Sequence, residues 1–71
     1  MEDQVFLERL GKKISTLREK EGISQNELAR RLNTGNNQIR RIEKAIAAPN
    51  ILTLKKIGDE LGILLSELVN V

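Results

Sequence analysis

Residues 24–44 have the sequence SQNELARRLNTGNNQIRRIEK, which predicts two short helices joined by a tight turn. Ser24 and Glu27 have the spacing of a capping box, in which each side chain bonds to the other residue's backbone N–H. A helix is therefore expected to begin at Gln25. It should end at Asn33, because asparagine is one of the few residues besides glycine that tolerate the left-handed conformation common at helix ends.

The second of these helices is expected to span about residues 36–45 and to have two different faces. One face carries three isoleucines, Ile39, Ile42 and Ile46. The opposite face carries only amides and cations, namely Asn36, Asn37, Arg40, Arg41 and Lys44. Cationic groups pair with phosphates, and Asn and Arg make bidentate contacts with adenine and guanine edges. The face therefore indicates nucleic-acid binding, with an ordinary solvated helix face as the alternative.

Residues from about 10 to 68 resemble the helix-turn-helix domain of phage repressors and Cro proteins, an XRE-like family. The matching segments are LGKKISTLREKEGISQNELARRL (10–32), IRRIEK (39–44), PN (49–50), LTLKKIGDELGI (52–63) and SELV (66–69). The resemblance implies an all-α fold, a compact five-helix bundle of the lambda-repressor type whose second and third helices form the motif. It also implies a sequence-specific transcriptional regulator that binds double-stranded DNA as a homodimer on a palindromic operator.

Sequence on either side of the motif predicts the other three helices. The first should span residues 3–21 and end at Gly22. Its cations Arg9, Lys12, Lys13 and Lys20 are expected to be solvated surface charges, and contact of the nearer ones with a phosphate is the alternative. Asn50 can cap a fourth helix over residues 51–61, and a short fifth helix should follow over residues 65–69. Because no linker or low-complexity segment divides the chain, residues 1–71 are expected to form a single domain.

The resemblance implies a role for most polar residues of the motif. Contacts with bases are expected from Asn36, Asn37, Arg40 and Arg41, with Arg40 either reading a base or holding a phosphate. Contacts with phosphates are expected from Ser24, Gln25, Gln38 and Lys44. Of these, Gln25 also lies at a helix N-terminus, where the helix dipole favours an anion.

Glu43 lies between Ile39 and Ile46, on the side of the second motif helix that should face inward. An unpaired carboxylate in that position would be costly. Arg18, at the border of the first helix's apolar stripe, is the expected partner, since the resembling repressors have a buried or half-buried arginine–glutamate pair at the matching positions. This pair should orient the recognition helix rather than contact DNA.

Three positions depart from the pattern of the resembling family. Gly35 stands where a Ser or Thr usually caps the recognition helix, Ala45 replaces the glycine that commonly ends it, and Leu64 replaces a polar cap. Apolar residues gather in the region that resembling repressors use for dimerisation: Ile46, Ile51, Leu52, Leu64 and Leu65. A two-fold interface is expected there, and the alternative is that these leucines complete the core.

Composition excludes several classes of site. The chain has no cysteine and no histidine, so disulfides, thiolate or imidazole metal sites and Ser-His or Cys-His nucleophiles are excluded. With 71 residues it is too small for both a core and a deep catalytic cleft. We therefore expect no enzymatic activity, no cofactor and no metal.

Charge and hydropathy bear on the partners of the chain. The net charge is only +2, but residues 30–44 contain five cations opposed by Glu43 alone. No apolar stretch approaches membrane-spanning length, so a cytoplasmic protein without a membrane partner is expected. The alternative function is a helical protein–protein interaction module, or an antitoxin-type domain, with the same fold, because fold does not fix function.

Overall fold

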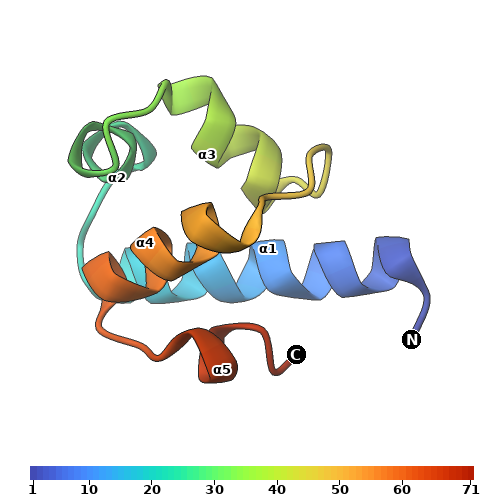
Figure 1. The fold of residues 1–71 in the computed structure, drawn as a ribbon. Helices are drawn as coiled ribbons and strands as arrows, with labels where there is room; N and C mark the ends of the chain where they lie inside the picture. Colours follow the sequence, from blue (N-terminus) through green and yellow to red (C-terminus); the bar gives the residue numbers. More distant parts are fainter.

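The computed structural model describes all 71 residues and contains five helices and no strands (Figure 1). The helices are α1 (Asp3–Lys20), α2 (Gln25–Arg31), α3 (Asn36–Glu43), α4 (Ile51–Leu61) and α5 (Leu65–Leu68). All five begin at the predicted residue, and their ends differ from the predicted ends by at most two residues. The all-α, five-helix prediction is confirmed, with α2 and α3 forming the helix-turn-helix.

The long helix α1 is the support on which the other elements pack. Figure 1 shows α2 and α3 on one side of α1 and α5 on the other, with α4 packed against α1, α2 and α5. One cluster of buried apolar residues joins all five helices: Leu10, Ile14, Ile23, Leu28, Ala29, Ile39, Ile42, Leu54, Ile57, Leu61 and Leu68. None of the helices is both long enough and apolar enough to cross a membrane.

Two helices begin at side-chain caps that were predicted from the sequence. The Ser24 hydroxyl accepts a hydrogen bond from the Glu27 backbone N–H at 3.0 Å, and the Asn50 side chain accepts one from the Thr53 N–H at 2.8 Å. The predicted reciprocal half of the capping box is wrong. The Glu27 carboxylate binds arginines of its own helix instead, because guanidinium groups are stronger donors than one backbone N–H.

Four helices end at a residue in the left-handed conformation, followed by a residue whose N–H bonds back into the last turn. These left-handed residues are Gly22, Asn33, Ala45 and Gly62. At the end of α3, Ala45 has φ +59°, and the Ile46 N–H donates to the Arg41 carbonyl at 2.9 Å. Ile46 falls on the same side of the helical wheel as Ile39 and Ile42, but it does not pack with them, which agrees with the expectation that Ile46 is partly exposed. The chain turns away at Ala45, and Ile46 is 60% exposed.

Helix α1 approaches the end of α3 closely enough to hold it in place. A Cβ atom at Gly11 would lie 2.6 Å from the Glu43 carbonyl oxygen and 2.7 Å from that of Ile42, so only glycine permits this approach. Near the start of α1, the Gln4 side chain donates to the Ala45 carbonyl at 3.3 Å. The C-terminal end of α3 is therefore fixed by backbone contact as well as by side chains.

Lys13 of α1 has a structural role that its position in the sequence did not reveal. Its ammonium group donates to the carbonyl of Glu67 and, at 3.1 Å, to that of Asn70. The Glu67 carbonyl also accepts from the Asn70 backbone N–H, so the cation adds to the hydrogen bonding at the end of α5, where the helix dipole is negative. The prediction that Lys13 is simply a solvated charge is wrong.

Candidate nucleic-acid interface

Helix α3 separates its apolar and cationic side chains completely. Ile39 and Ile42 are buried, and they attach the helix to the core. Five polar residues are exposed to solvent: Asn36, Asn37, Arg40, Arg41 and Lys44. The ion pairs of the structure involve none of these cations. Their charges are therefore available to a partner outside the chain.

The only acid of α3, Glu43, is turned inward to Arg18. The Arg18 Nε–Glu43 Oε2 distance is 2.7 Å and the Arg18 Nη2–Glu43 Oε1 distance is 3.1 Å, which is a bidentate pair. The two side chains are only 11% and 6% exposed. The hydrogen bonds with Glu43 raise the pKa of the Arg18 guanidinium above its ordinary value, more than burial lowers it. The pair thus joins α1 to the end of α3 and keeps negative charge off the cationic face.

Two further groups complete the hydrogen bonding of this pair. Arg18 Nη1 donates to the Ile23 carbonyl at 2.8 Å, and Gln25 Nε2 donates to Glu43 Oε1 at 2.9 Å. Gln25, expected from the sequence to contact phosphate, is half-buried and directs one side-chain N–H toward the interior. The link between Gln25 and Glu43 was missed from the sequence, and no spacing pattern would have revealed it.

At the other end of α3, the turn brings two asparagines together. Asn36 Nδ2 donates to Asn26 Oδ1 at 2.7 Å, and both residues are exposed. Asn26, the second residue of α2, did not stand out in the sequence. Of the other predicted phosphate contacts, Ser24 is exposed and already accepts the cap hydrogen bond, Gln38 is half-buried, and Lys44 is exposed at the C-terminal end of α3.

Glu27 holds the two arginines of α2. Its carboxylate accepts from Arg30 at 3.0 and 2.6 Å and from Arg31 at 2.8 Å. The hydrogen bonds from Arg30, and then those from Arg31, lower the pKa of Glu27 to about 2. The single carboxylate of this exposed cluster offsets one of the two arginine charges and holds both guanidinium groups on α2.

We expect Glu27→Gln to lower stability in a way that depends on pH. Because the folded-state pKa lies below the ordinary value of 4.5, the carboxylate contributes stability above about pH 4.5 and loses it as the pH falls toward 2. Urea unfolding of both proteins should therefore show a constant difference above pH 5 that disappears near pH 2. Glu8→Gln is the matched control, since Glu8 is exposed and forms no ion pair. A difference that persists at pH 2 would contradict the proposed origin of the stability.

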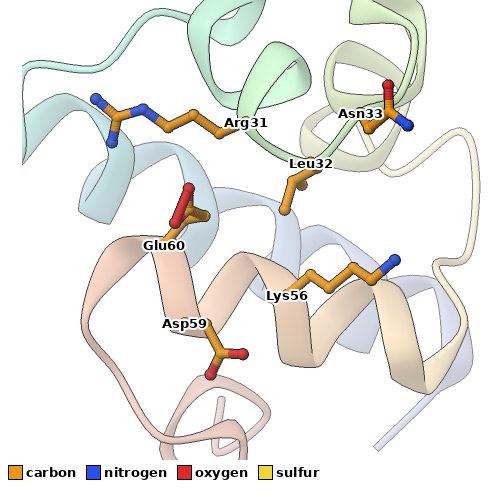
Figure 2. A pocket seen from close by; sticks show the side chains of 6 residues that line it. All are labelled: Arg31, Leu32, Asn33, Lys56, Asp59 and Glu60. Atoms are coloured by element: carbon orange, nitrogen blue, oxygen red, sulfur yellow. The ribbon is translucent and has the colours of Figure 1, made fainter.

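The hollows on the surface lie away from the cationic face. One of about 400 Å³ lies between the end of α2 and helix α4 (Figure 2). It is lined by Arg31, Leu32, Asn33, Lys56, Asp59 and Glu60. Charges of both signs surround it, and none of the residues expected to contact DNA lines it. The candidate interface is instead an exposed helix face that lines none of the surface hollows.

A comparison with protein families relates this arrangement to known proteins. Residues 14–68 match the model of the helix-turn-helix family HTH_3. The chain belongs to this helix-turn-helix family. It is also similar to the crystal structure of an HTH_3 family transcriptional regulator from Vibrio cholerae, with 25% sequence identity and a TM-score of 0.85. The match covers 94% of this chain and 38% of the Vibrio chain. A comparison with curated proteins found no significant match.

Gly35 is the residue at which the turn of this helix-turn-helix leads into α3, and it has no side chain to cap that helix. Gly35 precedes α3 with φ −71°, and α3 has no side-chain cap. A Cβ atom at Gly35 would meet no atom within 4 Å, so neither space nor backbone conformation requires glycine there. In place of a bond to a cap hydroxyl, the Gln38 N–H donates to the Gly35 carbonyl at 3.1 Å.

Proposed function

We propose that this chain is a sequence-specific DNA-binding transcriptional regulator that inserts α3 into the major groove. The observation that carries the proposal is the exposed, acid-free face of α3, attached to the core by its isoleucines and by the Arg18–Glu43 pair. Amides and guanidinium groups on one helix are the chemistry that reads base edges in the major groove. Membership of the helix-turn-helix family and the similarity to a transcriptional regulator support it.

The residues divide into base-reading and phosphate-binding groups. Bases are read by Asn36, Asn37, Arg40 and Arg41, which are all exposed. Phosphates are held by Ser24, Gln25, Gln38 and Lys44. Gln25 has one side-chain N–H that no hydrogen bond within the chain uses, so it supports the Arg18–Glu43 pair and binds a phosphate at the same time.

The proposed regulator acts as a homodimer on a palindromic operator. Among the apolar residues predicted for the interface, Leu64 is 67% exposed whereas Leu65 packs partly on the core. Ile46, Ile51 and Leu52 are also exposed, at 60%, 65% and 56%. Leu52 is the second residue of α4, and Leu64 lies beyond the end of this helix at Leu61. The 11 residues of α4 span about 16 Å. We therefore centre the two-fold interface on Leu64, with the recognition helices about 34 Å apart.

Leu64→Asp is expected to prevent dimerisation. A carboxylate at the centre of an apolar interface is buried without a partner, which opposes association. Sedimentation of the free protein at tens of micromolar should show a dimer for the wild type and a monomer for this variant. Thr16→Asp is the matched control and should leave the dimer intact, because Thr16 is exposed on α1 and is not among the residues expected at the interface. A wild type that sediments only as a monomer, or a dimer that Thr16→Asp breaks and Leu64→Asp does not, would contradict this interface.

The function is tested by selecting bound sequences from a random DNA pool and measuring affinity for the selected sequence at two salt concentrations. We expect an inverted repeat with half-sites about one helical turn apart. Affinity should fall steeply with salt, because bound cations release counterions from DNA. If no sequence is enriched, the proposal is wrong, and the exposed apolar residues at the start of α4 favour a protein-interaction module instead.

A further inference from the structure

Helix α5 has only four residues, so its position depends on what holds it to the rest of the chain. Isolated helices shorter than about 12–15 residues are marginal in water. Leu68 is fully buried and anchors α5 to the core, and Leu65 and Val69 pack partly against the same cluster. The only side chain that hydrogen-bonds to residues 62–71 is that of Lys13 on α1. Apolar contacts and one cation therefore hold α5 in place.

The direction of the Lys13 contact is fixed by its chemistry, because an ammonium group can only donate and a backbone carbonyl can only accept. Lys13 donates to the Glu67 carbonyl and, at 3.1 Å, to the Asn70 carbonyl. The lysine is half-buried and borders the apolar stripe of α1, with Leu10 one turn before it and Leu17 one turn after it. Both acceptors are main-chain groups at the end of α5. The contact therefore positions the backbone of that helix and not a mobile side chain.

The position of Leu64 follows from that of α5. Leu64 directly precedes α5, and its carbonyl accepts the N–H groups of Glu67 and Leu68 at 3.0 and 2.9 Å. The Leu64 side chain is 67% exposed and belongs neither to the core nor to the apolar residues that pack against it. Its backbone is thus placed by the first turn of α5. If α5 left α1, the residue at the centre of the proposed two-fold interface would move with it.

The Lys13 contact is remote from the face that is proposed to read DNA. Figure 1 shows α5 on the side of α1 away from α2 and α3. Neither Lys13 nor its two acceptors hydrogen-bonds to a residue of the helix-turn-helix. Losing this contact should therefore leave the α3 face unchanged and affect DNA binding only through the dimer.

We propose that Lys13 is a positioning residue for self-association: by holding α5 against α1, it places Leu64 for contact with a second copy of the chain. The inference rests on the proposed function, since it requires the two-fold interface centred on Leu64. Lys13 acts through α5 and need not touch the second copy. A two-fold interface uses the same surface of both chains, so the loss of this contact affects both sides of the interface.

The first measurement is the dimer dissociation constant, by sedimentation. Lys13→Met should raise it about tenfold, which corresponds to α5 being docked in about a third of the molecules, since both chains must be competent to associate. Lys12→Met is the matched control, because Lys12 is the exposed neighbour of Lys13 and forms no ion pair. It loses the same charge and should leave the constant unchanged. Lys13→Arg keeps a cationic donor and should dimerise like the wild type.

The second measurement is amide hydrogen exchange, which shows whether the effect passes through α5. It is made in a Leu64→Asp background, so that dimerisation does not contribute to protection. There Lys13→Met should speed exchange of the Leu68 and Val69 N–H groups at least about tenfold, whereas amides of α2 and α3 should exchange as before. In the same background, affinity for a single operator half-site should not change.

An unchanged dissociation constant or unchanged exchange of α5 in Lys13→Met would overturn this inference and leave the proposed function standing. Equal effects of Lys12→Met and Lys13→Met would also overturn it, because they would show an effect of net charge alone. So would a loss of half-site affinity, which would make Lys13 a phosphate contact. A wild type that sediments only as a monomer would overturn the inference together with the two-fold interface. Failure of the proposed function shows itself separately, in a wild type that enriches no operator.

Discussion

Replacing Glu43 by alanine is expected to lower the free energy of unfolding by about 3–5 kcal/mol, because it leaves a buried guanidinium without its partner. The Arg18 side chain is only 11% exposed and gives two of its N–H groups to Glu43. Gln25 would lose its acceptor as well. Urea unfolding followed by circular dichroism measures the loss directly.

Two further variants test whether the loss of stability comes from a buried charge without a partner or from the loss of an ion pair alone. The double variant Arg18→Met/Glu43→Leu should be more stable than Glu43→Ala, since it leaves no charge in the interior. Asp59→Ala breaks the exposed pair between Lys55 and Asp59 and should cost at most about 1 kcal/mol. If Glu43→Ala cost no more than Asp59→Ala, the Arg18–Glu43 pair would not be what fixes the end of α3.

Replacing Arg41 by alanine is expected to weaken binding to the selected operator by about 1–3 kcal/mol and to relax the preference at one base pair. The Arg41 side chain is exposed and forms no ion pair within the chain, so folding should be unaffected. Affinities for the operator and its single-base substitutions, measured at one salt concentration, give both quantities.

Lys44→Ala is the matched comparison, because Lys44 is an exposed cation at the end of the same helix. It should weaken binding to all sequences alike. The slope of log affinity against log salt concentration should fall in magnitude by about one, as expected for the loss of one phosphate contact. Gln25→Ala is a poorer probe of phosphate binding, since Gln25 also bonds to Glu43. Equal losses for Arg41→Ala and Lys44→Ala on every sequence would show that the assignment of roles is wrong.

The motif and its helix starts could be predicted because their signals are local. The Ser24 and Asn50 caps each satisfy a backbone N–H three residues along the chain. The exposed face of α3 follows from helical periodicity alone. The end of α3 was less predictable, since Ala45 adopts a left-handed conformation that alanine rarely takes. That conformation turned Ile46 out of the apolar face.

The sequence by itself determined where each helix begins, which residues face the core and which cations lie together on α3. Only the tertiary structure decided how the polar side chains pair: Gln25 with Glu43, Asn26 with Asn36, and Lys13 with the end of α5. The physical reason is the distance along the sequence between the interacting residues. Caps and helix faces depend on neighbours within one or two turns, whereas these hydrogen bonds join elements that only packing of the core brings together.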